Sequence, residues 1–230
     1  MHASSVDRSL PYVAVVTAAG LGERMGGPKA LLAVRWGDGT GELPLAIAHA
    51  RAHLEGGADR VVVVTKAEVA RMLARFSQRA LDIVVSSAPH ELGPAGSIRH
   101  ALAMLPEDID WLMIEPVDMP PSSAAIRQEL LRGALRSPAP DAVRPVFEGR
   151  RGHPVLVKRS ALARMLVNDP PTLREVLAAL GDYDASKGGG ALDVDVVDVR
   201  AVTGFDVPPD VQKFYGHEAR FFEPEEPTFA

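Results

Sequence analysis

The hydrophobic positions of the first 140 residues alternate between short continuous runs and segments with helical spacing. Residues 13–16 and 61–65 are β-branched apolar runs of the kind that is buried on both faces of a parallel sheet. Apolar residues at intervals of three and four predict helices over 44–54 and 67–80. The same alternation predicts strands at 81–85 and 111–116, helices at 96–105 and 122–136, and a helical segment after Pro28. Four successive strand–helix units predict an α/β fold with a parallel, doubly wound sheet.

The pattern changes after residue 140. Two apolar runs flank a turn at 148–152, which predicts a hairpin and so antiparallel strands added to the sheet. We place the later elements as follows: strands at 141–147 and 154–158, short helices at 160–167 and 172–180, a loop at 186–190, a strand at 192–202 and a helix from 208 to 214. Residues 1–222 are expected to form a single domain, and the Pro- and Glu-rich residues 223–230 a mobile tail.

The loop after the first strand holds four glycines and two cations within ten residues: Gly20, Gly22, Gly26, Gly27, Arg24 and Lys29. A strand, a glycine loop and a helix together present backbone N–H groups to a phosphate. The glycine spacing is one residue too long for the dinucleotide fingerprint, and the residues around Lys29 do not fit the Walker pattern. The loop is therefore either an anion site of another type or a glycine-rich turn joining strand and helix.

Composition excludes several classes of function. The net charge of −5 and the lack of a basic stripe argue against a nucleic acid polymer as partner. The chain has no cysteine, which excludes disulfides and thiolate chemistry. It contains neither an apolar run of membrane-spanning length nor the apolar core of a signal peptide. We expect a cytoplasmic protein, without a membrane partner, that is a monomer or a homodimer.

Two acidic residues stand at predicted strand ends, where ligands bind in open α/β sheets. Asp118 follows the strand at 111–116; it could instead cap the next helix, although Ser122 and Ser123 are better placed. A Mg²⁺ ion beside a triphosphate takes one or two carboxylates, and Asp206 is the second candidate, with a helix cap as its structural alternative. The acids at 193, 195 and 198 alternate along a strand, as on a solvated face. His153, beside Arg151 in the hairpin, is either structural or faces an anionic substrate.

Residues 17–32, TAAGLGERMGGPKALL, resemble the LAAGxGxRMGxxKxLL motif of the MobA-like nucleotidyltransferases, which have a GT-A-like fold. The nearest group includes the molybdenum cofactor cytidylyltransferase and its guanylyltransferase relative. Further pieces match in order along nearly the whole chain: Trp36-Gly37, Gly93 followed by Ser97-Ile98, Asp118-Met119-Pro120, Gly152-His153-Pro154-Val155-Leu156 and, more weakly, Phe205-Asp206-Val207-Pro208.

The resemblance implies a three-layer α/β sandwich around a mostly parallel mixed sheet, the Rossmann-like fold of nucleotide-diphospho-sugar transferases. It implies that Lys29, Arg24 and Asp118 are catalytic and that Asp118 and Asp206 hold Mg²⁺. By the same resemblance His153 and Arg151 lie on the acceptor side, and Ala19, where guanylyl relatives more often have glycine, indicates a cytidine nucleotide. The implied nucleotide-binding residues are Ala18, Ala19, Gly20, Leu21, Gly22, Arg24, Lys29, Ser86, Gly93 and Ser97.

One segment departs from the family pattern. Residues 168–175, NDPPTLRE, stand where the cytidylyltransferases usually carry GDxGAR on the acceptor side. The leading hypothesis is a transferase that moves a nucleoside monophosphate, CMP in preference, from an NTP to a small phosphorylated acceptor, with molybdopterin among the candidates. The alternatives are a non-catalytic nucleotide- or cofactor-binding or delivery protein of the same fold, and a nicotinamide-dependent oxidoreductase, which the loop spacing disfavours.

Overall fold

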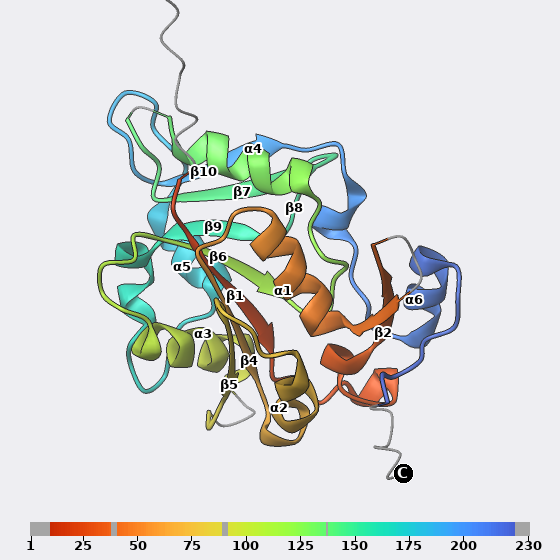
Figure 1. Ribbon diagram of the computed structural model, residues 1–230. Helices are drawn as coiled ribbons and strands as arrows, with labels where there is room; N and C mark the ends of the chain where they lie inside the picture. Colours follow the sequence, from red (N-terminus) through yellow and green to blue (C-terminus); the bar gives the residue numbers. More distant parts are fainter. Residues whose placement is uncertain (1–9, 38–40, 89–91, 137, 224–230) are drawn as a thin grey trace, which may run out of the picture.

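The computed structural model describes residues 10–37, 41–88, 92–136 and 138–223. The strands are β1 (Val13–Ala18), β2 (Ala33–Trp36), β3 (Gly41–Pro44), β4 (Arg60–Thr65), β5 (Leu81–Val85), β6 (Trp111–Pro116), β7 (Ala142–Phe147), β8 (Arg150–Arg151), β9 (Val155–Lys158) and β10 (Ala191–Asp195). The helices are α1 (Leu45–Glu55), α2 (Ala67–Leu73), α3 (Gly93–Met104), α4 (Ala124–Ala134), α5 (Leu173–Leu180) and α6 (Pro208–Tyr215). Apart from the hairpin of β2 and β3, the strands form one sheet in the order β10-β7-β9-β6-β1-β4-β5, with β8 paired to β7 (Figure 1).

The sheet is mixed and mostly parallel, as predicted. β1 lies between β4 and β6 and is parallel to both, and β5 extends this parallel part beyond β4. β9 is antiparallel to both β6 and β7. Our expectation that the later strands are all antiparallel is wrong for β10, which is parallel to β7. The hairpin has already reversed the chain at β9, and α5 carries it back before β10 begins.

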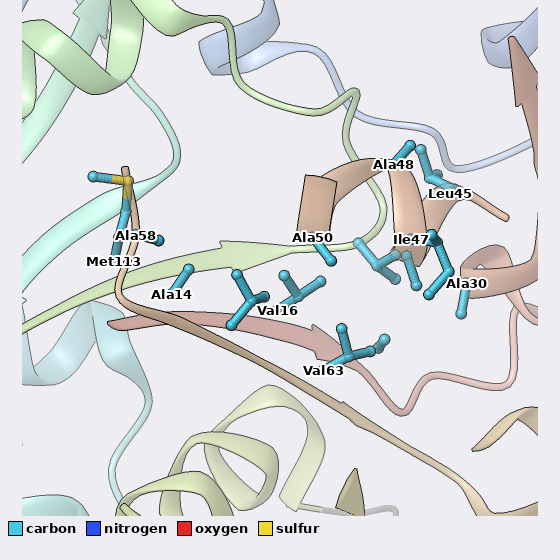
Figure 2. Packing of buried hydrophobic residues seen from close by; sticks show 14 of the residues in the cluster. Ala14, Val16, Ala30, Leu45, Ile47, Ala48, Ala50, Ala58, Val63 and Met113 are labelled. Carbon is cyan, nitrogen blue, oxygen red and sulfur yellow. The ribbon is translucent and has the colours of Figure 1, made fainter. Parts of the chain in front are cut away.

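Two hydrophobic clusters cover the two faces of the sheet. Alternate residues of β1 belong to different clusters: Ala14 and Val16 pack with α1 and α4, whereas Val13 and Val15 pack with α3 and α5. Figure 2 shows the first face, with Ile47 and Ala50 of α1 close to Val16 of β1. This period of two is the reason why a continuous valine run is buried on both sides. The predicted three-layer α/β sandwich is confirmed.

Three sequence predictions misjudge the local structure. After Pro28 the chain makes only a 3₁₀ turn, Lys29–Leu31, and then enters β2. The helix predicted over 67–80 ends at Leu73 and continues as a short 3₁₀ turn. The strand predicted over 192–202 ends at Asp195, because Asp198 accepts a hydrogen bond from the backbone N–H of Arg200 and starts a 3₁₀ turn instead. Only after Pro28 are all the apolar residues in question buried; in the other two segments some are exposed, among them Val197 at 95 %.

All but the first residue of the tail predicted at 223–230, and residues 89–91 of the loop before α3, lie outside the described residues. Among the residues that are described, no helix combines the length and apolar character needed to cross a membrane.

Candidate functional site

The ends of β1 and β6 and the start of α6 meet at one edge of the sheet. The backbone N–H of Val117 donates to the carbonyl of Thr17 at 3.1 Å, which joins the turn after β6 to the end of β1. The backbone N–H of Phe205 donates to the carbonyl of Asp118 at 2.7 Å. This bond brings the segment that carries Asp206 next to Asp118. The two acids that the sequence placed at separate strand ends therefore share one site.

Lys29 lies between the two carboxylates. Its Nζ is 3.5 Å from Asp118 Oδ2 and 3.5 Å from Asp206 Oδ1. Arg24 Nη2 is 3.3 Å from the same Oδ1 of Asp206. The side chain of Lys29 is 15 % exposed, whereas those of Asp118 and Asp206 are 47 % and 63 % exposed. The site is thus an open cluster of two cations and two carboxylates with the lysine at its centre.

Neither acid has the structural role that was its alternative. α4 is capped by Ser123, whose Oγ accepts from the backbone N–H of Ile126. At α6 the carboxylate of Asp210 accepts from the backbone N–H groups of Asp206 and Val207 at 2.8 and 3.0 Å. The pKa of Asp210 is lowered by these two bonds. The side chains of Asp118 and Asp206 are consequently left to face the glycine loop.

The donor set suits a hard divalent cation. Carboxylate oxygens are what Mg²⁺ takes from a protein, usually one or two of them, together with phosphate oxygens and waters. Among the described residues, no group of three or more His, Cys, Asp or Glu side chains could hold a metal ion. An ion at Asp118 and Asp206 would therefore need further oxygen ligands, from waters or from a phosphate, to complete its coordination.

The glycine loop is folded against itself at Gly22. This residue has a φ of 67°, and its carbonyl accepts from the N–H groups of Met25 and Gly27. A Cβ at Gly22 would lie 1.9 Å from the carbonyl oxygen of Gly27, whereas one at Gly20 would meet no atom within 4 Å. The loop lines a cleft of about 380 Å³ with Gly20, Leu21, Gly22, Glu23, Arg24, Lys29, Val117, Asp118 and Asp206.

A second, narrower cleft adjoins the first at Gly20. The predicted residues Ser86, Gly93 and Ser97 line it together with Thr17, Ala19, Gly20, Lys66, Ala88 and Pro94. Gly96 of α3 packs closely against Ala88 in the lining, because a Cβ at Gly96 would lie 2.8 Å from Cβ of Ala88. Ala18 lines neither cleft; it is buried, and its carbonyl accepts from Oγ1 of Thr65. Its place in the motif is structural.

A third cavity, of about 570 Å³, lies between α3 and α5, and we call it the α3–α5 cavity. His153 and Arg151 line it, as do Thr172, Leu173 and Arg174 from the segment that departs from the family pattern. Burial lowers the pKa of His153, which favours the neutral imidazole. Thr172 and Glu175 form a capping box at the start of α5, so the departing segment begins a helix. Arg144 also lines the cavity and was not predicted; the signal for it was an arginine inside an apolar strand.

A buried polar network behind Asp118 was missed as well. Glu115, on β6, is 1 % exposed, and its Oε2 is 2.6 Å from Nε2 of His53 and 3.3 Å from Nδ1 of His49. Burial raises the pKa of Glu115, but the two histidines outweigh burial and hold it well below its usual range. Burial lowers the pKa of His53 more than Glu115 raises it. The signals were an acid inside an apolar strand and two histidines one helical turn apart on α1.

This network holds the turn that carries Asp118. The backbone N–H of Ser122 donates to Glu115 Oε1 at 2.8 Å, and Arg127 donates to the carbonyl of Ser122. Nε2 of His49 donates to the carbonyl of Met119 at 2.9 Å, since that oxygen can only accept. The residues that follow Asp118 are therefore tied to buried groups on α1, β6 and α4, and the carboxylate projects from a fixed turn.

Comparison with known proteins yields one family and a set of structural neighbours. Residues 14–185 match the model of the MobA-like NTP transferase domain. None of the curated proteins matches the sequence significantly. The manganese complex of Rv0371C from Mycobacterium tuberculosis superposes with a TM-score of 0.63 at 19 % identity, covering 90 % of this chain and 99 % of that one.

Two transferases superpose as well. A nucleotidyl transferase from Methanothermobacter gives a TM-score of 0.66 at 19 % identity, covering 90 % of this chain and 97 % of that one. The inositol-1-phosphate CTP transferase from T. maritima gives 0.59 at 17 % identity, covering 89 % and 93 %. At these identities the structures establish the shared fold, whereas the family model covers most of the chain. The glycine loop, Lys29 and Asp118 all fall within the matched residues, and the chain therefore belongs to the MobA-like NTP transferase family.

Proposed function

We propose that the protein transfers a nucleoside monophosphate, CMP in preference, from an NTP to a small phosphorylated acceptor and releases pyrophosphate. The observation that carries the proposal is the position of Lys29 Nζ, 3.5 Å from the carboxylates of both Asp118 and Asp206 at the mouth of a glycine loop. Family membership supports the reaction class. The fold shared with a CTP transferase supports CTP, and so does Ala19 in the narrow cleft.

The residues present match a reaction that needs charge placement more than a strong base. A phosphate monoester, with a second pKa near ~6, is largely ionised at neutral pH and can act as the nucleophile itself. One of its oxygens forms the new bond to the α-phosphorus, and the bond from that phosphorus to the pyrophosphate oxygen breaks. Lys29 and Arg24 would offset the negative charge that gathers on the departing pyrophosphate. No proton has to move for this step.

Asp118 and Asp206 would hold Mg²⁺ in this proposal. A bound Mg²⁺ would neutralise phosphate charge, and the two carboxylates would fix its place beside Lys29. The manganese complex of Rv0371C supports a divalent cation in this fold. The hydrogen bonds from His49 to Met119 and from Ser122 to Glu115 would keep Asp118 in a fixed position while substrate binds and product leaves.

Nucleotide binding gives the first test, because it does not require the acceptor. Titration calorimetry with CTP and GTP, each with and without Mg²⁺, should show Mg²⁺-dependent binding and a preference for CTP. Lys29→Ala and Asp118→Asn should weaken binding, and their pyrophosphate release should fall roughly 10²–10³-fold once an acceptor is supplied. Lys187→Ala and Asp195→Asn change exposed residues that line neither cleft and serve as matched controls. Wild-type affinity and turnover in the Lys29 and Asp118 variants would refute the assignment.

The second candidate is a non-catalytic nucleotide- or cofactor-binding or delivery protein. The observation that favours it is the use of residues 168–175 to start α5 where the cytidylyltransferases have GDxGAR, which also counts against molybdopterin as acceptor. Nucleotide binding that ignores Mg²⁺, with no pyrophosphate released for inositol 1-phosphate, glycerol 3-phosphate or molybdopterin, would favour this candidate.

A further inference from the structure

The α3–α5 cavity adjoins the narrow cleft. Thr17 and Pro94 line both this cavity and the narrow cleft that holds Ser86 and Ser97. Pro116, also in its wall, ends the strand that leads to Asp118. A molecule in the cavity would therefore lie beside a bound NTP, within reach of its phosphates. The inference below rests on the proposed transferase function and concerns the acceptor.

The body of the cavity is apolar. Three aliphatic side chains in its wall, Ile98, Ile114 and Val155, are each only 2 % exposed, and they come from α3, β6 and β9. Leu173 and Leu177 of α5 close the opposite side. A sugar or polyol placed here would bury hydroxyl groups that the wall leaves without partners, which is unfavourable. An acceptor that fits this wall has an apolar frame.

Two arginines, Arg144 and Arg151, line one end of the cavity. Arg144 is 7 % exposed; its Nε donates to Asp193 at 2.7 Å, while its Nη2 is buried and has no hydrogen-bond partner among the described residues. Nε of Arg151 donates to the other oxygen of Asp193 at 2.9 Å, so one carboxylate orients both guanidinium groups. Oδ1 of Asp182, whose side chain is 88 % exposed, lies 3.9 Å from Arg144 Nη2 and 3.5 Å from Arg151 Nη2. No acidic side chain lines the described part of the cavity.

A buried guanidinium N–H without an acceptor is costly, and such groups usually meet a carboxylate or phosphate. We propose that the acceptor is an apolar molecule with two anionic ends: the phosphate that attacks the NTP, and a second oxyanion that Arg144 and Arg151 bind at the far end of the α3–α5 cavity. Arg144 is thereby assigned as a specificity-determining residue, since its free Nη2 distinguishes an acceptor with the second anion from one without it.

Three probe molecules separate the two parts of this proposal. They are 6-carboxy-2-naphthyl phosphate, which has an apolar frame and a second anion, 2-naphthyl phosphate, which lacks that anion, and glycerol 3-phosphate, which lacks the apolar frame. Calorimetry on the protein saturated with CTP and Mg²⁺ should give affinities in that order. The added carboxylate should gain about tenfold or more, the usual worth of a hydrogen bond between charged groups.

Matched variants locate each part. Arg151→Gln should remove the gain from the carboxylate without changing affinity for 2-naphthyl phosphate, and Arg144→Gln should do the same if it folds. Arg150→Gln alters the neighbouring arginine of β8, which does not line the cavity, and should leave all three affinities unchanged. Leu173→Ser should weaken both naphthyl probes but not glycerol 3-phosphate. Leu166→Ser, at an exposed leucine outside the cavity, is its control.

The outcomes distinguish this inference from the proposed function. If CTP binds with Mg²⁺ but the naphthyl probes bind no tighter than glycerol 3-phosphate, the acceptor inference is wrong and the transferase proposal stands. If the carboxylate gain survives Arg151→Gln and Arg144→Gln, the second-anion site is wrong. If the probes bind in the expected order while CTP does not bind, the cavity assignment stands and the transferase proposal fails.

Discussion

The carboxylate of Glu115 should be worth several kilocalories per mole, and Glu115→Gln tests this with little change of shape. Oε1 of Glu115 accepts from the backbone N–H of Ser122, and Oε2 accepts from His53. A glutamine has one acceptor oxygen and one NH₂ group, so either orientation turns a donor toward a buried donor. The substitution also removes the carboxylate charge that lies 2.6 Å from Nε2 of His53 and 3.3 Å from Nδ1 of His49.

The magnitude follows from these two losses. A buried unsatisfied donor costs about 1–3 kcal/mol, and a hydrogen bond to a charged group contributes about 1 kcal/mol more than one between neutral groups. We expect the free energy of unfolding to fall by about 2–4 kcal/mol, which for a chain of this size lowers the Tm by about 4–16 °C.

Urea denaturation gives the measurement, with fluorescence as the probe, because Trp111 lies buried on the same strand as Glu115. Glu129→Gln on the solvent side of α4 is the control, since its partner Arg132 is exposed and such pairs contribute about 0–1 kcal/mol. A loss below about 1 kcal/mol in Glu115→Gln would show that the carboxylate is not the centre of the network.

Three further predictions concern stability. The pKa values of Glu115 and His53 are lowered in the folded protein, so the unfolded chain binds more protons as the pH falls. The free energy of unfolding should therefore fall as the pH drops below about 6.5, the ordinary pKa of histidine, and again below about 4.5, that of glutamate. Equal urea midpoints at pH 8 and pH 5 would contradict this. Gly22→Ala should lower the free energy of unfolding by about 1–3 kcal/mol, since the residue has a φ of 67° and its Cβ would lie 1.9 Å from a backbone carbonyl oxygen. Gly20→Ala, where a Cβ would meet no atom within 4 Å, is the control. Equal Tm values for the two variants would refute the loop geometry. Thr172→Ala should cost about 1 kcal/mol through loss of the capping box, as judged by urea denaturation, and an unchanged midpoint would show that the box does not hold α5.

The central strands were predictable because local and global signals agree there. The run at 111–114 is apolar and short and follows Asp110, and β6 has the predicted bounds 111–116 in the structure. The prediction for the segment after Pro28 failed because Ala30, Leu31 and Leu32 are apolar in a helix-compatible order, yet the backbone that follows pairs with residues 220–222. The backbone N–H of Ala33 donates to the carbonyl of Arg220, a pairing that no local pattern contains.

The residues of the site also include some that the sequence could predict and some that it could not. Lys29 and Asp118 were accessible from the glycine loop and from the rule that ligands bind at strand ends. Glu115 and Arg144 were not, because a single charge in an apolar strand does not reveal its partner. Finding the partner of Glu115 requires knowing that α1 packs over β6, and finding that of Arg144 requires knowing that β10 lies beside β7. Sequence patterns thus located groups that face the solvent edge and missed groups whose role depends on packing.

The hydrogen bond from Phe205 to the carbonyl of Asp118 has a consequence for the order in which the site is assembled. During synthesis the glycine loop, Lys29 and Asp118 emerge long before residue 206. Until the last segment docks, the loop has its cations and only one of its two carboxylates. The carboxylate pair is completed by the final helix-bearing segment of the chain, so the proposed Mg²⁺ site should be complete only once that segment has docked. A partly made chain would thus have Lys29 and Arg24 in place with Asp118 but without Asp206.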